Sequence, residues 1–268
     1  MNDKETSLKY WKDRKFYAPS LLTETKIRLT ESLTSVPEGG TAVDGGGGDF
    51  TERSSARYVY DRLASHLKQF TLYVVDLPEK PASVPENAVY VQGDLDELEY
   101  LVSPPWHHAS FIAVVHEPLD WIKLIHTAGK VQRQGDRLFF SSIPLALNEK
   151  MDLVHLAESR VRGYRTRRFL SHQIPEVLRE VGFKVETLTL TYGEDHPEAA
   201  RIPWGLFQEL LPQSEAETMV RFAEKHSLEM DKHSRSFVKS LAIALQSQDP
   251  DELVLLPAIF QIICAEKQ

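Results

Sequence analysis

The sequence contains a single cysteine, Cys264, among 268 residues. One thiol cannot form an internal disulfide or a multi-cysteine zinc site, and its apolar neighbours favour an inert buried thiol over a nucleophile. The sequence also lacks any apolar run of the eighteen or more residues that a membrane helix needs, and its first six residues are polar. We therefore expect a cytoplasmic protein with no membrane partner.

Basic residues are outnumbered as well. There are 31 Lys and Arg residues against 39 Asp and Glu residues, which gives a formal net charge of −8. This balance opposes broad binding to nucleic acid phosphates or anionic lipid. The densest basic cluster, between Arg160 and Arg168, is typical of a solvated helix face, although it would also suit an acidic substrate or RNA.

The order of apolar segments predicts strands that alternate with helices. Runs typical of strands lie at 41–43, 71–75, 88–91, 110–115, 137–143, 183–190 and within 253–265. Helical spacing is found at 20–33, 54–70, 119–131, 152–162, 174–181 and through much of 197–248. This alternation predicts an α/β protein with a doubly wound sheet, whose ligand lies beyond the carboxyl ends of the strands.

Glycines and two acids follow the first three predicted strands. Gly45 to Gly48 form a run of four glycines directly after Asp44, Asp76 ends the second strand, and Asp94 follows the third. Glycines let the backbone approach a ligand closely, and carboxylates can accept hydrogen bonds from ribose hydroxyls or an adenine amino group. The pattern indicates an adenosine-type ligand. The alternatives are a solvent loop for the glycines and helix capping for each acid.

These residues resemble the class I S-adenosylmethionine-dependent methyltransferases. The first motif of that family, hydrophobic-Asp-x-Gly-x-Gly, matches Val43 to Gly48, and its two later acids match Asp76 and Asp94. The resemblance implies a Rossmann-like, mostly parallel sheet of seven strands and S-adenosylmethionine as the cofactor. It also implies cofactor contacts from Asp44, Gly45, Gly46, Gly48, Asp76, Leu77, Asp94 and Leu95.

A nicotinamide-binding Rossmann domain is the nearest alternative, because it also begins with a strand, a glycine turn and a helix. Its fingerprint, Gly-x-Gly-x-x-Gly, is not completed in either register. The third position is Phe50 when counted from Gly45 and Thr51 when counted from Gly46.

The resemblance also divides the chain into three parts. We predict an N-terminal helical arm or lid over 1–36, a cofactor-binding core over 37–192 and 251–268, and a helical insertion over 193–250 before the last strand. In this family such insertions commonly build the acceptor pocket, so the insertion is expected to act as a substrate cap.

Residues after the fourth strand are the candidates for catalysis. His116 could deprotonate an acceptor beside Glu117, although either could equally be an ordinary polar residue of the wall. The candidate acceptor-side residues are Tyr17, Tyr192, Trp204 and Phe207, for which packing alone is the alternative. We expect a small organic acceptor methylated on oxygen, nitrogen or carbon. The oligomeric state stays open, with a homodimer among the options.

Two further functions compete with this interpretation. Phe50 stands where a third glycine commonly follows, and Ser110 or Ala109 stands where an acid often begins the fourth strand. These departures suit a protein that binds the cofactor without transferring methyl groups. The arginines at 160–168 would suit an RNA methyltransferase. No metal is expected, because the adjacent His107 and His108 should point apart.

Overall fold

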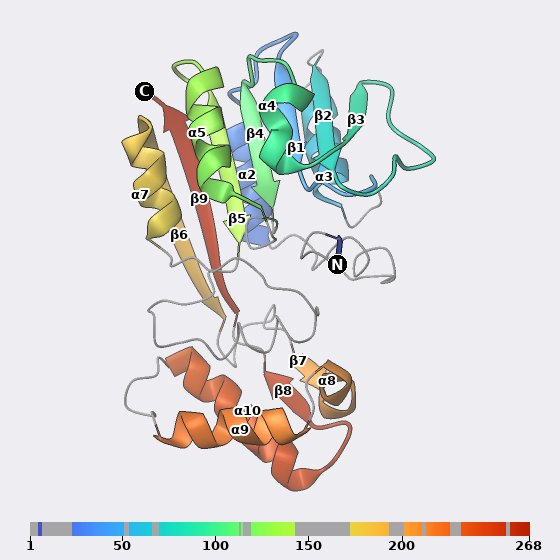
Figure 1. Cartoon of the computed structure of the whole chain (residues 1–268), viewed down its shortest axis with the longest axis vertical. Coiled ribbons are helices and arrows are strands. Elements are labelled where there is room, and N and C mark those ends of the chain that lie inside the picture. Colours follow the sequence, from blue (N-terminus) through green and yellow to red (C-terminus); the bar gives the residue numbers. More distant parts are fainter. Residues whose placement is uncertain are drawn as a thin grey trace. The chain divides into compact units, whose positions relative to one another are not determined.

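The computed structural model describes residues 5–6, 23–50, 54–65, 70–112, 114, 119–142, 172–192, 201–210, 213–225, 232–255 and 258–268. The chain forms two compact units. The first unit holds the large sheet and its helices, and the second holds a small sheet with further helices (Figure 1).

The first unit is built on a sheet that has seven strands among the described residues, in the order β3-β2-β1-β4-β5-β9-β6. The strands are β1 (Thr41–Gly45), β2 (Thr71–Asp76), β3 (Ala88–Gln92), β4 (His108–Ile112), β5 (Arg137–Ser142), β6 (Phe183–Tyr192) and β9 (Ala258–Lys267). Strands β1 to β5 pair in parallel, whereas β9 runs antiparallel to β5. The predicted doubly wound, mostly parallel sheet of seven strands is thus confirmed.

Helices cover both faces of this sheet. Helix α2 (Thr23–Leu33) packs against α3 (Ser55–Ser65) on one face, and α5 (Trp121–Val131) packs against α7 (Gln173–Glu180) on the other (Figure 1). Every residue of β4 is buried. A parallel strand covered on both sides buries both of its faces, which explains why this segment shows no alternation of exposed and buried residues, and its two polar side chains, His108 and Ser110, are hydrogen-bonded.

Local chemistry sets the ends of the helices on the second face. The Asp120 carboxylate accepts a hydrogen bond from the backbone N–H of Lys123 and so caps the start of α5. Helix α7 ends at Glu180 and is followed by Gly182, which has a φ of 87° and donates its N–H to the carbonyl of Arg179. Glycine adopts this left-handed conformation without strain, so the chain turns directly into β6.

In the part of the second unit that the structure describes, there are a two-stranded sheet and three helices. Strand β7 (Arg201–Pro203) pairs antiparallel with β8 (Leu253–Leu255). The helices are α8 (Trp204–Leu210), α9 (Gln213–Lys225) and α10 (Lys232–Ser247). The predicted apolar stretch 253–265 therefore holds two strands, one in each unit. Residues 251–260 belong to the second unit, whereas the predicted domain limits place them with the core.

No helix in the described ranges combines the length and the apolar character that a crossing of a lipid bilayer requires.

Candidate functional site

Strand order places the candidate site at the point where the chain reverses direction across the sheet. From β1 the chain continues outward to β2 and β3, and it then crosses back to β4 on the other side of β1. Open α/β sheets bind their ligands in a crevice beyond the carboxyl ends of the strands at such a switch point. The four-glycine run begins with Gly45, the last residue of β1, and therefore lies at this switch point.

The glycine turn is packed so closely that side chains are excluded. A Cβ atom at Gly45 would lie 2.5 Å from the Phe111 ring, and one at Gly46 would lie 2.6 Å from the Val114 side chain. Gly46 also has a φ of 72° and donates its N–H to the carbonyl of Val75 over 2.8 Å. The glycines thus let the backbone of the turn pack directly against neighbouring side chains of the protein, and a contact of the turn with a ligand stays a prediction.

Asp76 at the end of β2 faces this turn. Its Oδ2 atom accepts a hydrogen bond of 2.9 Å from the backbone N–H of Gly48, and its Oδ1 atom accepts one of 2.8 Å from Leu77. The two backbone donors fix the plane of the carboxylate, whose two oxygens can together accept several hydrogen bonds. This geometry suits a ligand that presents two neighbouring hydroxyl groups.

Asp94 and Leu95 follow β3 and have separate roles. The Oδ1 atom of Asp94 accepts from the N–H of Asp96, so that Asp94 caps the short 3₁₀ helix η1 (Leu95–Glu97). Leu95 is buried, and its Cδ2 atom lies 3.1 Å from the place where a Cβ of Gly45 would stand. Leu95 therefore supplies an apolar surface beside the turn, while a contact of Asp94 with adenine stays a prediction beside its capping role.

Asp44 lies in β1, just before the turn, and is fully buried. Its Oδ1 accepts a 2.6 Å hydrogen bond from the Ser110 hydroxyl of β4, and its Oδ2 accepts a 2.8 Å hydrogen bond from the Ser55 hydroxyl of α3. The pKa of Asp44 is raised to about 7, chiefly by burial and to a smaller extent by the charge of Asp76, while the hydrogen bonds from the two serine hydroxyls oppose this rise.

The sequence does not identify Ser55 and Ser110 as partners of Asp44. Ser110 stands out in the sequence only as a departure from the acid that is often found near that position in the family that the chain resembles. The register of β1 with β4 aligns Asp44 with Ser110, and α3 begins where Ser55 can reach the same carboxylate. Neither relation is visible as a spacing in the sequence, because both depend on how the strands and the helix pack.

Phe50 follows the turn in a conformation that residues with side chains seldom adopt. Its φ is 62°, and its side chain is 8% exposed. It lines a groove together with Asp49, Arg57, Tyr60, Pro81, Ala82, Ser83 and Pro85. Glycine would adopt this backbone conformation without strain. With phenylalanine, the free energy gained by burying the ring offsets the conformational cost of the positive φ.

Several predicted site residues lie outside the described structure. They are the candidate catalytic residues His116 and Glu117 and the candidate acceptor residue Tyr17. Tyr192 is the last residue of β6, and its side chain is not described. The roles of these four residues stay predictions.

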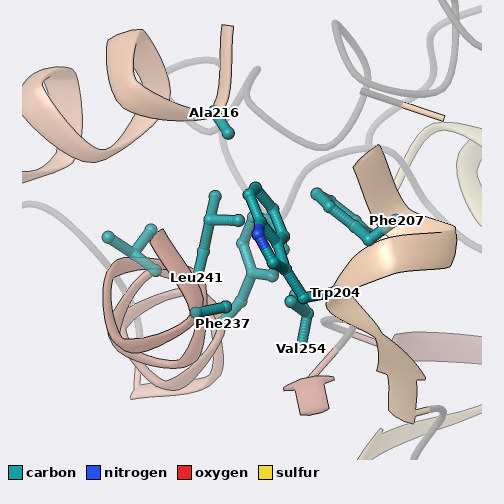
Figure 2. Packing of buried hydrophobic residues seen from close by; sticks show 8 residues of the cluster. Trp204, Phe207, Ala216, Phe237, Leu241 and Val254 are labelled. Carbon is teal, nitrogen blue, oxygen red and sulfur yellow. The ribbon is translucent and has the colours of Figure 1, made fainter. Parts of the chain in front are cut away.

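Trp204 and Phe207 are buried inside the second unit. Their rings stack with centroids 6.0 Å apart, and Phe207 meets Phe237 edge to face (Figure 2). Their exposed fractions are 2% and 4%, and they pack in one hydrophobic cluster with Leu241 and Val254. This placement favours the packing alternative, and contact of either residue with an acceptor stays a prediction.

The two adjacent histidines have different structural partners. His107 accepts a hydrogen bond on Nδ1 from the backbone of Thr41, whereas Nε2 of the buried His108 is 3.0 Å from the Ser32 hydroxyl. Within the described ranges, no three His, Cys, Asp or Glu residues are grouped so that they could hold a metal ion. Burial raises the pKa of the Cys264 thiol to about 11, which leaves little reactive thiolate at neutral pH.

Comparison with known proteins gives structural relatives only. No protein-family model matches the sequence. No curated protein matches it closely enough to count as a relative.

The structural relatives include methyltransferases. A candidate methyltransferase of Bacillus halodurans is 12% identical, with a TM-score of 0.61 over 91% of this chain and 99% of that chain. The YcgJ protein of Bacillus subtilis is 10% identical, with a TM-score of 0.61 over 92% and 99% of the two chains. A Haemonchus contortus phosphoethanolamine N-methyltransferase bound to S-adenosyl-L-methionine is 15% identical, with a TM-score of 0.51 over 99% of this chain and 57% of that chain. The chain therefore has the fold of the class I S-adenosylmethionine-dependent methyltransferases.

Proposed function

We propose that this protein is a methyltransferase that uses S-adenosylmethionine to methylate a small organic acceptor. The observation that carries the proposal is the meeting of the glycine turn, Asp76 and Leu95 at the switch point between β1 and β4. An open α/β sheet binds its ligand at this place, and these three features match the backbone, the sugar and the base of an adenosine.

The residues present fit such a cofactor. The oriented carboxylate of Asp76 accepts the two ribose hydroxyls, and Leu95 contacts the adenine ring. The aminoacyl part is proposed to lie against the backbone of the turn from Gly45 to Gly48, where no side chain of the turn stands in its way. When bound, the cofactor supplies a methyl group on a positively charged sulfonium.

The chain's own task is then to align an acceptor and to exclude water. His116 and Glu117 follow β4 in the sequence, and we propose them as the groups that take a proton from the acceptor where one must be removed. Tyr17, Tyr192, Trp204 and Phe207 remain the proposed acceptor-side residues. The net charge of −8 favours a small acceptor over a nucleic acid.

A methyl-transfer assay tests this proposal. The protein is incubated with methyl-labelled S-adenosylmethionine and a panel of small amines, phenols and carboxylic acids, and both label transfer and S-adenosylhomocysteine release are measured. We expect transfer to at least one acceptor class, with a large loss in Asp76→Ala. Glu86→Ala removes an exposed carboxylate from the loop between β2 and β3 and serves as the charge-matched control. Full activity of Asp76→Ala would contradict the assigned site.

A second candidate function has one observation in its favour. Phe50 is buried beside the turn in a strained conformation, where glycine would be the unstrained choice. A protein that binds the cofactor as a scaffold or regulator, without transferring methyl groups, would tolerate a turn of altered shape. Tight cofactor binding with no turnover across the whole acceptor panel would favour this second function.

A further inference from the structure

Two buried hydroxyl groups of the first unit have no hydrogen-bond partner among the described residues. They belong to Thr25 in α2 and Ser141 in β5, and both residues are 0% exposed. Burying a hydroxyl without a partner is costly, so buried hydroxyls nearly always bind another protein group, a water or a ligand. We call Thr25 and Ser141 the hydroxyl pair.

Thr25 lies on the face of α2 that packs on the large sheet. Ser32 follows it at helical spacing on the same face, and the Ser32 hydroxyl is 3.0 Å from Nε2 of His108 in β4. A threonine hydroxyl in a helix can donate to the carbonyl four residues earlier, as Thr30 does to Lys26. Thr25 is the third residue of α2, so no such carbonyl exists within the helix, and its hydroxyl needs a partner outside α2.

Ser141 lies on the sheet face that α2 covers. Successive side chains of a strand point to opposite faces, so Ser141 shares its face with Arg137, whose Nη1 donates to the Glu31 carbonyl of α2. Ser141 is aligned with Ile112 in β4 and with Ile262 in β9, and both isoleucines are buried. Its hydroxyl therefore has apolar neighbours on the α2 side of the sheet.

The hydroxyl pair lies towards the carboxyl ends of the strands. His108 and Arg137 are aligned at the amino ends of β4 and β5, and Ser32 near the end of α2 binds His108. Because α2 packs on β5, the start of the helix then lies towards the carboxyl end of that strand (Figure 1). Thr25 is about 10 Å from Ser32 along the helix, and Ser141 is about 13 Å from Arg137 along the strand. The two residues thus lie at similar levels of the sheet.

This level is also that of the glycine turn. Gly45 is aligned with Phe111 in β4, and Phe111 is aligned with Phe140 in β5. Ser141 follows Phe140, so it stands next to the level at which the turn begins, two strands away. Neighbouring strands are about 4.8 Å apart, which gives a separation of about 10 Å across the sheet. A small acceptor bound beside the cofactor could reach the hydroxyl pair.

We propose that Thr25 and Ser141 form an acceptor subsite that binds an uncharged hydroxyl group, as in an alcohol or a phenol. This inference rests on the proposed function, because it takes the occupant to be the methyl acceptor. A ligand hydroxyl both donates and accepts, so it can satisfy the two protein hydroxyls together. The isoleucines beside Ser141 suit an apolar body, and two neutral hydroxyls compensate only part of the cost of burying a charged group.

Binding of three single-ring probes, phenol, toluene and benzoate, tests the proposal. The full chain is titrated with each probe, with and without S-adenosylhomocysteine, while NMR follows the backbone amides of α2 and β5. We expect phenol to bind more tightly than toluene or benzoate. Thr25→Val and Ser141→Ala each remove one hydroxyl, and each should reduce the preference for phenol over toluene about fivefold.

Thr30→Val and Ser32→Ala are the matched controls. Each removes a hydroxyl that has a partner in the protein, so each should lower the midpoint of urea unfolding and leave the preference for phenol unchanged. Loss of a hydroxyl without a partner has the opposite signature. Thr25→Val and Ser141→Ala should keep or raise the unfolding midpoint of the free protein while they weaken phenol binding.

The outcomes separate this inference from the proposed function. A preference for phenol that neither Thr25→Val nor Ser141→Ala changes would overturn the inference, as would benzoate binding more tightly than phenol. Absence of phenol binding at α2 and β5 would also overturn it, because the hydroxyl pair would then bind a buried water only. S-adenosylmethionine should bind both variants like the wild-type protein. A wild-type protein that selects phenol through the pair but binds no S-adenosylmethionine would refute the proposed function and leave the hydroxyl site standing.

Discussion

Phe50 allows a test of backbone strain, because replacement by glycine should destabilise the protein less than replacement by alanine. The left-handed conformation of this residue, with a φ of 62°, costs a residue with a Cβ about 1–2 kcal/mol. Loss of a buried phenylalanine side chain costs about 3–5 kcal/mol. Burial is the larger effect, which explains why phenylalanine is tolerated here and why both truncations should destabilise the protein.

The two truncations should differ by the backbone contribution. Phe50→Ala loses the packing and retains the strain, so we expect a loss of about 3–5 kcal/mol in the free energy of unfolding. Phe50→Gly loses the same packing but removes the strain, so it should be more stable than Phe50→Ala by about 1 kcal/mol. Because the chain has two units, backbone hydrogen exchange in β1 and β2 is the appropriate assay.

Gly39→Ala isolates the backbone contribution. Gly39 has a φ of 70°, and a Cβ there would meet no atom within 4 Å. Gly39→Ala should therefore lose about 1 kcal/mol in the free energy of unfolding, and this loss would come from the backbone conformation alone. Should Phe50→Gly prove no more stable than Phe50→Ala while Gly39→Ala is destabilised as expected, the account of a strained Phe50 is wrong.

Three shorter predictions concern the site and its surroundings. In Gly45→Ala the new Cβ would lie 2.5 Å from the Phe111 ring, so we expect a loss of about 1–3 kcal/mol in unfolding free energy and weaker ligand binding, both measured beside Gly39→Ala. Burial raises the folded-state pKa of Asp44 to about 7 from an ordinary 3.8, so the protonated carboxyl contributes about 4 kcal/mol to the free energy of unfolding. This contribution is complete below about pH 4 and is lost as the pH rises through 7. Urea unfolding should show a matching decline with pH that Asp44→Asn lacks. For His108, burial lowers the pKa to about 3, so the imidazole should stay neutral at pH 5 in the folded protein and its contribution should be lost as the pH falls from 6.5 towards 3; an imidazolium detected by NMR at pH 5 would contradict the assigned burial.

The sequence predicts the arrangement of the first unit well because its elements carry strong local signals. Short runs rich in apolar and β-branched residues, such as Thr71–Asp76, favour strands between helices, and the glycines after Asp44 favour a tight turn. The last strands are harder to predict. The stretch from 253 to 265 is apolar almost throughout, and nothing in its composition indicates that Leu253–Leu255 pairs with β7 while the following strand joins the large sheet.

The candidate site is predicted only in part for a related reason. The residues proposed to contact a ligand through motif positions, such as Asp76 and the glycines, can be identified from their order along the chain. Ser55 and Ser110 act on Asp44 from a helix and a strand, and their role depends on register and packing. Trp204 illustrates the opposite difficulty, because an aromatic residue in an insertion has the same sequence pattern whether it lines a pocket or fills a core.

The most direct measurement for the central claim is equilibrium binding of S-adenosylmethionine to the wild-type protein, Asp76→Ala and Glu86→Ala. Hydrogen bonds to a charged group contribute about 1.5–3 kcal/mol each, so loss of the Asp76 carboxylate should weaken binding at least tenfold. Glu86→Ala should bind like the wild-type protein. Binding that Asp76→Ala leaves unchanged, or a wild-type protein that binds no S-adenosylmethionine, would contradict the assignment of this crevice as the cofactor site.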